Sequence, residues 1–487
     1  MLDLVGQSAM DLTTGYGWVL ALWIGVAIGA AGHALISRRD PRTAWGWIAV
    51  CWLFPFAGPA LYFLFGINRI RTHAQRLGMD ARGDGAIGRA HADDLRNRRA
   101  EGEVIPPWLD ELARTADRLT HLPLLDGNRI EVLHNGEQAY PRMLAAIDGA
   151  RRSVALATYI FDNDAVGRRF VEALARAQAR GVDVHVMIDG FGQHYSLVPI
   201  TRELRRAGID HAVFNPLRLL PPSLHLNLRS HRKLLLIDGA VGYTGGMNIG
   251  RRQMVGEGGS GAATDMQFEL RGPILNQLGQ VFADDWRWCG KPEWRVPPAA
   301  AGDDLGAACR VVTDGPNEDF DHLTMVLQAA ISAAHREVRI MTPYFLPPNE
   351  MIAELQAAAL RGVRVEVILP ARSNLPFVHW ATRNMLGELL RFGVRVYYQP
   401  PPFCHSKLFV VDGVYAQIGS ANLDARSLKL NFELTVEVYD RAFAQTLNAH
   451  FDAVRTQSRD VPLAEIDGRS LPARLRDAAF WLFSPYL

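Results

Sequence analysis

The sequence predicts an α/β protein of two similar lobes, each a β-sheet flanked by helices, related by a pseudo-twofold axis and preceded by an N-terminal hairpin of two membrane helices. Three observations predict this fold. The chain opens with two hydrophobic stretches, both halves alternate helical segments with short β-branched strands, and one polar motif occurs twice with the same spacing. The 487 residues also exceed what one domain usually holds, about 100–200 residues, so more than one domain is expected.

The hydrophobic stretches run from Gly17 to Ile36 and from Ala44 to Gly66. Neither contains an Asp, Glu, Lys or Arg, and each is about long enough to cross a bilayer as a helix. A cleaved signal peptide would begin with basic residues, whereas only Asp3 and Asp11 carry charge before Gly17. Residues 1–66 are therefore interpreted as a multi-pass membrane anchor.

The orientation of this anchor stays open at the level of the sequence. Basic clusters follow both stretches: Arg38, Arg39 and Arg42 after the first, and Arg69, Arg71 and Arg76 after the second. The positive-inside rule would put both clusters in the cytoplasm, which is impossible if both helices cross fully. A break at Pro55, Gly58 and Pro59 would make the second stretch re-entrant and let the clusters share one side.

The remainder divides into a juxtamembrane linker (67–124), a first lobe (125–296), a linker of Pro, Ala, Gly and Asp (297–308) and a second lobe with a C-terminal tail (309–487). Each lobe opens with the same run of elements. We expect helix 143–152, strand 153–159, helix 170–180 and strand 181–189 in the first lobe, and helix 326–335, strand 337–344, helix 351–361 and strand 362–369 in the second.

The repeated motif is the most informative feature. Two of the only four lysines of the chain stand in His231-Arg-Lys233 and His405-Ser-Lys407. Four mostly apolar residues then lead to Asp238-Gly239 and Asp412-Gly413. Six residues further on come Gly245-Gly-Met-Asn248 and Gly419-Ser-Ala-Asn422. Two strings with one spacing indicate a single active site built from two copies of one half.

The spacing also predicts local structure. His and Lys two residues apart share one face of a strand. An Asp-Gly pair between apolar runs favours a β-hairpin, with Leu234–Ile237 and Leu408–Val411 as buried strands. Asp238 and Asp412 belong to the motif and thus to the candidate catalytic set, although their place in the turns favours a structural role.

The residue types indicate phosphodiester chemistry. Two lysines offer compact charges to the anionic oxygens of a phosphodiester, and the motif asparagines add neutral donors. No carboxylate cluster accompanies the motifs, so we expect neither a metal nor a cofactor. The net charge of +1 argues against nucleic acid as a partner. The four cysteines are too scattered for a disulfide framework or a zinc site.

The paired strings resemble the HKD motifs of the phospholipase D superfamily, and the rest of the chain resembles bacterial cardiolipin synthases. The second resemblance is carried by the segments 158–164, 245–249, 427–433 and 482–487. It implies two phospholipase D-like lobes in the bacterial inner membrane. It also implies transfer of a phosphatidyl group between two phosphatidylglycerol molecules, through a phosphohistidine, to give cardiolipin and glycerol. Phosphatidylglycerol and other anionic phospholipids would be the partners, and the oligomeric state stays open.

The two histidines need different roles, because one must attack phosphorus while neutral and the other must give a proton to the leaving alcohol. The resemblance places Glu433 behind His405. Aligning the halves puts Gln267 opposite Glu433 and so beside His231, with Glu269 on the same strand face as an alternative. This asymmetry predicts His231 as nucleophile and His405 as general acid/base, the order that the resemblance also implies. The candidate site residues are therefore His231, Lys233, Asp238, His405, Lys407 and Asp412 for catalysis, and Asn248, Asn422, Gln267 and Glu433 for substrate binding.

Several alternatives remain at this stage. Water could resolve the same intermediate, which would make a hydrolytic phospholipase D, or another alcohol could accept the group. A nuclease and a lipid-binding scaffold with an inactive site are more distant readings. The Gly-rich segment 256–261 departs from the family pattern and leaves the acceptor open. Tyr159 and Tyr344 either line the headgroup pocket or pack in the core, and the C-terminal segment 480–487 either enters the lipid interface or docks on the second lobe.

Overall fold

The structure, a computed structural model, describes residues 2–37, 41–66, 107–216, 228–299, 306–315 and 321–484. The chain forms two compact units, Met1–Arg76 and Leu77–Leu487. Residues 67–106 lie outside the described residues, and with them the basic cluster after the second hydrophobic stretch and most of the predicted juxtamembrane linker. Residues 38–40, in the loop between the two stretches, lie outside them as well.

The first unit begins with one long helix, α1 (Leu2–Ser37). Its segment Gly17–Ser37 has 21 residues and a mean hydropathy of 2.1, so it is long and apolar enough to cross a membrane. Within the described residues it is the one helix that meets both conditions. The first hydrophobic stretch therefore forms the helix that the sequence predicts.

The second hydrophobic stretch is broken near Pro55, as one of the two interpretations of the sequence expects, and does not form a second continuous spanning helix. The second stretch is divided into α2 (Pro41–Leu53), α3 (Ala57–Leu61) and the π-helical turn η1 (Tyr62–Gly66). Pro55 has no amide hydrogen for a helix, and Phe56 adopts a left-handed φ of 58°. The 13 residues of α2 extend only about 20 Å, short of the roughly 30 Å hydrocarbon core of a bilayer.

The broken segment folds back along α1. The hydroxyl of Tyr62 lies 2.7 Å from Nδ1 of His33, four residues before the end of α1, and Cys51 packs with Ala34 and Tyr62. The chain thus leaves α1 at Ser37 and returns through η1 to nearly the same level of that helix.

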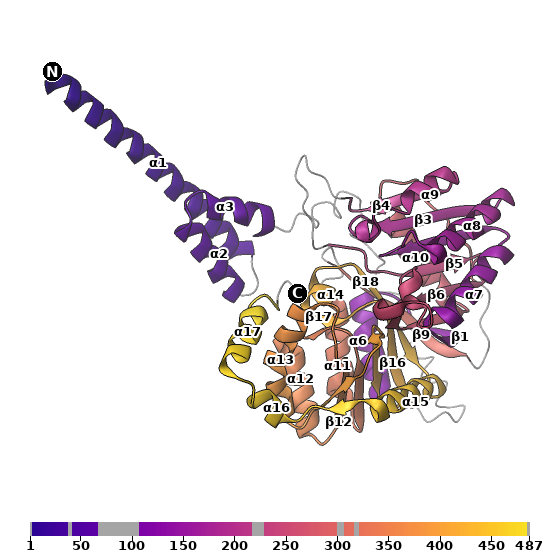
Figure 1. The fold of residues 1–487 in the computed structure, drawn as a ribbon. Helices are drawn as coiled ribbons and strands as arrows, with labels where there is room; N and C mark the ends of the chain where they lie inside the picture. The colour runs from indigo at the N-terminus through magenta and orange to yellow at the C-terminus, as the bar shows by residue number, and fades with distance from the viewer. Residues whose placement is uncertain are drawn as a thin grey trace. The chain divides into compact units, whose positions relative to one another are not determined.

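The second unit is built on one 15-stranded sheet that runs through both lobes (Figure 1). Its order is β19-β13-β12-β10-β15-β16-β18-β9-β1-β8-β6-β5-β2-β3-β4, so corresponding strands of the lobes follow each other in mirror order from the centre outward. The first-lobe strands are β1 (Leu125–His134), β2 (Ser153–Thr158), β3 (Asp183–Asp189), β4 (Asp210–Phe214), β5 (Leu234–Ile237), β6 (Val241–Gly245) and β8 (Met266–Arg271). The second-lobe strands are β9 (Ala307–Asp314), β10 (Glu337–Met341), β12 (Arg364–Pro370), β13 (Arg395–Gln399), β15 (Leu408–Val411), β16 (Tyr415–Gly419), β18 (Glu433–Tyr439) and the edge strand β19 (Arg459–Asp460).

The lobes join at the antiparallel pair of β1 and β9. The side-chain amide of Asn128 spans the junction by donating to the carbonyl oxygen of Ala307 at 3.0 Å. The second lobe therefore begins at Ala307, two residues before the predicted boundary of 309. Residues 300–305 of the predicted linker lie outside the described residues.

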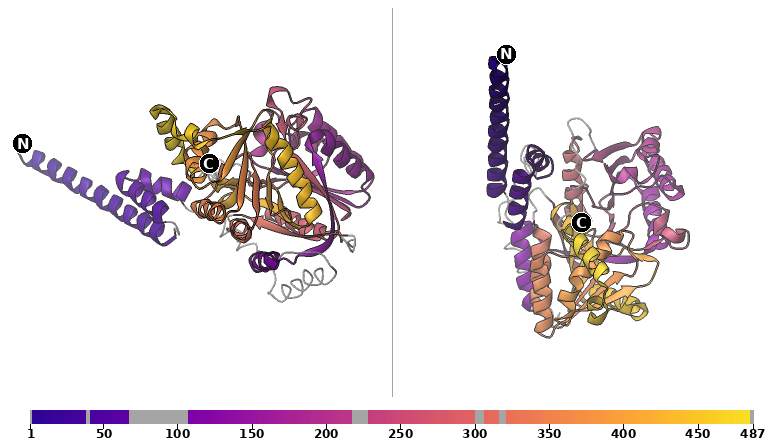
Figure 2. Two further views of the ribbon diagram at one scale, coloured as in Figure 1. Left: turned by 90° about the horizontal axis from the view of Figure 1, so that it is seen from below. Right: turned by 60° about the vertical axis from the view of Figure 1, so that its left-hand side comes forward.

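Helices flank the sheet in both lobes and occur in the same order along the chain (Figures 1 and 2). The first lobe has α7 (Asn135–Gly149), α8 (Ala165–Ala179), α9 (Thr201–Arg206) and α10 (Ile274–Trp288). The second has α11 (His322–Ala333), α12 (Asn349–Leu360), α13 (Pro376–Leu390), α14 (Ala425–Lys429), α15 (Arg441–Gln457), α16 (Leu463–Asp467) and α17 (Leu471–Trp481). The two-lobed α/β fold predicted from the sequence is thereby confirmed, and each lobe has its own apolar core.

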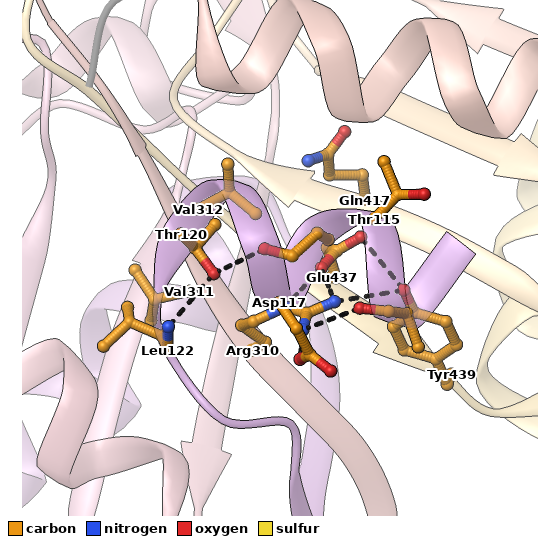
Figure 3. Close-up of polar contacts among 12 residues, drawn as sticks. Thr115, Asp117, Thr120, Leu122, Arg310, Val311, Val312, Gln417, Glu437 and Tyr439 are labelled. Atoms are coloured by element: carbon orange, nitrogen blue, oxygen red, sulfur yellow. Dashed lines mark hydrogen bonds and ion pairs between the residues drawn. The ribbon is translucent and has the colours of Figure 1, made fainter. Parts of the chain in front are cut away.

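Helix α6 (Pro107–Thr120) lies inside the segment predicted as a linker and packs on the second lobe. Its residues Leu109, Leu112 and Ala116 are buried in that core. The helix is also held by a buried polar network around Arg310 of β9 (Figure 3). The Arg310 side chain is 0% exposed; it pairs with Glu437 at 2.7 Å and with Asp117 of α6.

The C-terminal helix α17 packs against α13 of the second lobe. Phe480 lies with its ring 5.0 Å from that of Trp380, and buried Asp477 pairs with Arg383 at 2.9 Å. Of the two predictions for the C-terminal segment, the structure thus favours docking on the lobe, and residues 485–487 lie outside the described residues.

Candidate active site

The two predicted hairpins are present and place the motif residues. β5 turns into β6 through Asp238 and Gly239, whose φ angles of 56° and 67° are both left-handed, as in the turns that Asp-Gly favours. Asp412 and Gly413, with φ angles of 52° and 65°, repeat this turn between β15 and β16. The strands begin one residue after each lysine, so His and Lys stand on the extended segment that leads into the hairpin.

Each motif lysine is tied to its own histidine. Lys233 Nζ donates to the carbonyl oxygen of His231 at 2.6 Å, and Lys407 Nζ does the same to His405 at 2.6 Å. The histidine side chains are only 18% and 17% exposed, so the motif is largely buried. Backbone pairing joins the segment before each histidine to the other lobe, Ser230 to Phe432 and Phe403–Cys404 to Ala263–Thr264, so the two motifs meet at the junction of the lobes.

The carboxylates behind the histidines come from the opposite lobes. Glu433, at the start of β18, lies with Oε1 3.1 Å from Nδ1 of His231 in the first lobe. Asp265, just before β8, lies with Oδ2 2.7 Å from Nδ1 of His405 in the second lobe. The backbone supports both pairs, because the His231 amide donates to Phe432 O at 2.9 Å and the His405 amide to Thr264 O at 2.8 Å.

This arrangement corrects the predicted roles of Gln267 and Glu433. In the first lobe Gly245 of β6 faces Gln267, and in the second lobe Gly419 of β16 faces Thr435. Gln267 therefore corresponds to Thr435, and the residue that corresponds to Glu433 is Asp265. The alignment was wrong because the segment between the motif asparagine and the carboxylate is longer in the first lobe, so sequence spacing alone could not set the strand register.

Neither Gln267 nor Glu269 takes the predicted place. Gln267 is buried, and among the described residues no hydrogen bond joins its amide to either histidine. The Glu269 carboxylate accepts from the hydroxyl of Tyr243 at 3.0 Å and pairs with Arg271 and Arg142. The sequence did contain a signal for Asp265. This carboxylate stands directly before strand β8, just as Glu433 stands at the start of the corresponding strand β18.

The immediate surroundings of the two carboxylates differ. In the second lobe the hydroxyl of Ser420 donates to Glu433 Oε2 at 2.6 Å. In the first lobe Gly246 stands at the place of that serine, and a Cβ there would meet Asp265 Oδ1 at 2.6 Å. The first motif thus has a glycine where Asp265 leaves no room for a side chain, and the second has a serine that donates a hydrogen bond to Glu433.

Burial shifts the pKa values of the site residues. It lowers the pKa of His405 to about 4, aided by Lys407 and opposed by Asp265. It also lowers the pKa of His231, opposed there by Glu433. Burial lowers the pKa of Lys233 to about 8, again opposed by Glu433. For Glu433, burial raises the pKa, but His231 and Lys233 outweigh it and hold the carboxylate ionised. An anionic phosphodiester between these groups would favour their protonated forms.

The two histidine rings also differ in the polar contacts of Nε2, the ring nitrogen that faces away from the carboxylate. Lys407 Nζ lies 3.2 Å from Nδ1 and 3.3 Å from Nε2 of His405. Among the described residues, the polar contacts of the His231 ring are on Nδ1 alone: Glu433, and Asn431 Nδ2 at 3.3 Å. The ring of Tyr159 packs 4.3 Å from that of His231, so this tyrosine lines the site.

The predicted catalytic aspartates lie outside the site. Asp238 accepts hydrogen bonds from the amides of residues 151, 152 and 153 at 2.8, 2.7 and 2.8 Å. Asp412 accepts from the amides of residues 335, 336 and 337 at 3.0, 2.8 and 2.8 Å. Both stand at the end of the hairpin away from the histidine and lysine, where they fix the start of a neighbouring strand.

The motif asparagines hold loops beside the site. Asn248 Oδ1 accepts from the amide of Ile160 at 3.1 Å, next to Tyr159. Asn422 Nδ2 donates to Ser427 Oγ at 3.3 Å and so fixes the start of α14. On the second-lobe side, Tyr344 donates to Asn374 Oδ1 at 2.8 Å and its ring lies 6.4 Å from Phe403, which in turn lies 6.0 Å from the ring of His405.

Two His–Lys units at the junction of a doubled α/β sheet, each histidine backed by a carboxylate of the other lobe, define an enzyme of the phospholipase D class. The family described as "Cardiolipin synthase, PLD-like domain" matches residues 143–286 and 327–455, and "Phospholipase_D-nuclease N-terminal" matches residues 18–66. The chain belongs to the cardiolipin synthase family, and its activity is that of a phosphatidyltransferase. It is membrane-associated, and its substrates are phospholipids.

Similar proteins extend over nearly the whole chain. "Cardiolipin synthase A" of Pseudomonas aeruginosa (strain UCBPP-PA14) is 32% identical over 458 residues, 91% of this chain and 91% of that protein. "Major cardiolipin synthase ClsA" of Bacillus subtilis (strain 168) is 30% identical over 462 residues, 93% of this chain and 95% of that protein. The crystal structure of phosphatidylserine synthase of Haemophilus influenzae Rd KW20 has the same fold, with a TM-score of 0.61 and 15% identity, over 77% of this chain and 100% of that one.

Proposed function

We propose that this enzyme transfers a phosphatidyl group from one phosphatidylglycerol to the headgroup hydroxyl of a second, which gives cardiolipin and glycerol. The observation that carries the proposal is the pair of buried His–Lys units, each histidine backed by a carboxylate of the other lobe. Such a site can hold one phosphodiester between two lysines and present a histidine to each side of the phosphorus. The family relationship supplies the lipid class.

In the first step, Nε2 of neutral His231 attacks the phosphorus of the donor lipid and forms a P–N bond. The P–O bond to glycerol breaks, and His405, protonated on Nε2, gives its proton to the departing oxygen. Lys233 and Lys407 stabilise the charge of the five-coordinate phosphorus. In the second step, His405 takes the proton of the acceptor hydroxyl, whose oxygen attacks phosphorus while the P–N bond breaks.

The contacts of the two rings support this order. His231 Nε2 has no polar contact among the described residues, whereas Lys407 lies against Nε2 of His405. Bound phosphodiester draws Lys407 toward its oxygens and favours protonation of His405, which then acts as the acid. Glu433 and Asp265 accept the Nδ1 protons and keep Nε2 of each ring toward the substrate. As a coupled pair, the histidines titrate together.

We further propose that the protein lies in a bacterial inner membrane with α1 as its spanning helix. The segment from α2 to η1 would be re-entrant, which replaces the predicted multi-pass hairpin. The contact of Tyr62 with His33 supports this, because it returns the chain to the level at which α2 began. On this path the chain would enter and leave the segment from α2 to η1 on one side of the membrane. Cysteines placed singly at Thr43 and at Arg69 in a variant without native cysteines should react with a membrane-impermeant maleimide from the same side; labelling from opposite sides contradicts the re-entrant path.

The purified full-length chain, incubated with phosphatidylglycerol vesicles, should yield equal amounts of cardiolipin and glycerol by mass spectrometry. Phosphatidic acid as the main product would identify a hydrolytic phospholipase D instead. His231→Ala and His405→Ala should each reduce turnover by at least about a thousandfold. With phosphorus-labelled donor, acid-labile label should accumulate slowly on the His405→Ala protein, which keeps the nucleophile but lacks the acid of the first step and the base of the second. It should be absent from His231→Ala, and the reverse pattern exchanges the two roles.

A further inference from the structure

The substrates are phospholipids, yet the two histidines that act on them are largely buried. The phosphate of a phospholipid lies at the membrane surface, and its acyl chains stay in the hydrocarbon core because their transfer into water is strongly unfavourable. The phosphate therefore reaches the histidines most easily when the edge of the lobes beside the site touches the bilayer. Such a contact is needed whichever alcohol accepts the phosphatidyl group, so it goes beyond the proposed reaction and does not depend on it.

The site lies at the edge of the sheet where the parallel strands end. Met341, the last residue of β10, pairs with Leu408, the residue after the lysine of the second motif. In the first lobe Ala157, near the end of β2, pairs with Leu234, the residue after the lysine of the first motif. Since β3 and β12 run parallel to β2 and β10, the segments that follow all four strands lie at the edge that carries the site.

The segment that follows β3 exposes apolar side chains at this edge. It contains the short 3-10 helix η2 (Gly192–Tyr195), and Tyr195, Leu197 and Val198 are exposed. The ring of Tyr195 lies 6.1 Å from that of Tyr159, the tyrosine that lines the site. The exposed apolar residues of this loop are therefore neighbours of the first-lobe wall of the site.

Specific contacts hold this loop in place. Ser196 Oγ accepts from the amide of Asn163 at 3.0 Å and donates to Asp162 Oδ1 at 3.1 Å. The carbonyl oxygen of Val198 accepts from the side-chain amide of Asn163 at 3.2 Å. Because Leu197 stands between these two anchored residues, the loop keeps its side chain in the exposed position.

On the second lobe, helix α17 turns a charged side inward and an apolar side outward. Asp477 is buried and pairs with Arg383 at 2.9 Å. Leu471, Leu475 and Leu482, spaced by four and seven residues, lie on one face of the helix and are 66%, 62% and 70% exposed. A helix whose outer side faces water has the reverse pattern, so this outer face suits an apolar medium.

The carboxyl end of α17 belongs to the edge that carries the site. Phe480 and Trp481 pack in one apolar cluster with Tyr344, which follows β10. Leu482 and Phe483 come directly after them and are exposed. The helix itself lies at the outer edge of the second lobe, beside α13 (Figure 1). Exposed apolar side chains thus border the site on the second lobe as they do on the first.

The charge around α17 suits an anionic surface. Residues 468–484 contain three arginines and one acidic residue, the buried Asp477. Arg474 and Arg476 are exposed next to the leucines. Arginines that border an apolar helix face are typical of segments that lie among the headgroups of anionic bilayers.

We propose that two segments insert into the lipid bilayer at the two sides of the site: the loop of Tyr195, Leu197 and Val198, and the end of α17 at Leu482 and Phe483. The partner is an anionic phospholipid surface. A bilayer fits this place better than a second copy of the chain, because it also supplies the substrate that must enter between the two segments. Phospholipid then moves sideways into the site while its acyl chains remain in the membrane.

An exposed leucine at the other edge of the sheet provides a matched control. Leu360 is 69% exposed, nearly as much as Leu482. It ends α12, which runs back from the site edge toward the start of β12 at Arg364. Arg364 pairs with Glu337 at the start of β10, at the edge away from the histidines.

Fluorescence quenching by lipid tests the contact directly. Full-length variants without native cysteines carry one cysteine labelled with nitrobenzoxadiazole, from Leu197→Cys, Leu482→Cys or Leu360→Cys, in vesicles that contain phosphatidylglycerol. Lipid with a nitroxide on its acyl chain should quench the first two probes at least about twofold, because both would lie at the boundary of the hydrocarbon core. The probe of Leu360→Cys should lose less than about a tenth of its fluorescence, because it would stay in water.

The contact should also govern how the site gains its substrate. Leu197→Glu combined with Leu482→Glu places charge at the boundary of the hydrocarbon core and so weakens docking. This variant should raise at least about fivefold the surface fraction of phosphatidylglycerol that gives half-maximal release of glycerol. Leu360→Glu should leave that fraction within about twofold of the wild-type value.

The outcomes separate this inference from the proposed function. Quenching at Leu197→Cys and Leu482→Cys supports the docking even if the wild type makes no cardiolipin, a result that would overturn the proposed reaction alone. A probe at either position that nitroxide lipid does not quench overturns the docking, and a blue shift of that probe would show that protein covers it instead. Equal quenching at Leu360→Cys overturns it too. If the labelled proteins do not reconstitute, the glutamate variants decide: an unchanged half-saturating fraction rejects the proposal.

Discussion

His405 of the second lobe is oriented by Asp265 of the first, with Nδ1 2.7 Å from Oδ2. Conversely, His231 of the first lobe is oriented by Glu433 of the second, with Nδ1 3.1 Å from Oε1. Neither lobe therefore contains a complete histidine–carboxylate unit, and catalysis requires that the junction of the lobes be closed. The parallel pair of β14 (Phe403–Cys404) and β7 (Ala263–Thr264) fixes one of these contacts through the backbone.

The exchanged carboxylates predict a specific mutational pattern. Asp265→Asn and Glu433→Gln keep the size of the side chain but remove the anion that holds Nδ1–H, so each should reduce kcat by about 100- to 10,000-fold. Gln267→Leu, at the position that the sequence alone paired with His231, should reduce kcat by less than about tenfold. The measurement is kcat with phosphatidylglycerol vesicles.

The same variants should also differ in trapping of the intermediate. With labelled donor, Asp265→Asn impairs His405, which acts as the base of the second step, so this variant should retain phosphohistidine longer than Glu433→Gln. A loss in Gln267→Leu as large as in Asp265→Asn would contradict the strand register observed here.

The motif aspartates should matter for folding rather than for chemistry. Asp412→Ala leaves the amides of residues 335–337 without their acceptor, which should cost about 2–4 kcal/mol in the free energy of unfolding. Its kcat per folded molecule should stay within about threefold of wild type. Lys407→Met is the matched contrast, with little loss of stability and nearly complete loss of turnover. Active-site titration beside urea unfolding measures both; a folded Asp412→Ala protein without activity would return this residue to the catalytic set.

The buried network of Figure 3 should dominate the stability of the second lobe. Arg310→Met leaves Glu437, which is 0% exposed, as an uncompensated buried charge, so the free energy of unfolding should fall by about 3–5 kcal/mol. Arg364→Met removes a guanidinium that is 54% exposed and pairs with Glu337, and should cost less than about 1 kcal/mol. Urea unfolding in detergent measures the difference, and similar losses in both variants would contradict the importance of burial.

His450 should make stability depend on pH. Its ring in α15 lies 5.1 Å from that of His134 in β1, and burial, with the charge of His134, lowers the pKa of His450 to about 4 from 6.5. Between these values the unfolded chain binds more protons than the folded one. The stability that depends on a neutral, buried His450 is therefore fully present above pH 6.5 and is lost as pH falls toward 4.

Other groups add to the pH dependence of the wild type, since His405 acts in the same direction and the raised pKa of Asp424 acts in the opposite one. The informative quantity is thus the difference between wild type and His450→Gln. Thermal unfolding at a series of pH values should show that the advantage of wild type over this variant shrinks from pH 7 to pH 4.5. A difference that does not change with pH would contradict the buried state of His450.

Local features of the chain were readable from the sequence because they depend on short-range physics. Asp238-Gly239 and Asp412-Gly413 adopt left-handed angles that few other pairs tolerate, so both hairpins followed directly. The apolar run from Gly17 forms a helix of sufficient length for the same kind of reason. For the second run, hydropathy alone favoured a full span, whereas Pro55, which the sequence also shows, interrupts the helix together with the left-handed Phe56.

By itself, then, the sequence determined two His–Lys motifs, their hairpins, a doubled α/β fold and a helix fit to cross a membrane. The tertiary structure decided which carboxylate serves which histidine: Asp265 rather than Gln267 corresponds to Glu433, and each acts on the opposite lobe. The physical reason is that these partners are set by strand register and by the joining of β1 to β9. Backbone pairing across the sheet fixes both, and the intervening loops differ in length, so spacing along the chain carries no record of either.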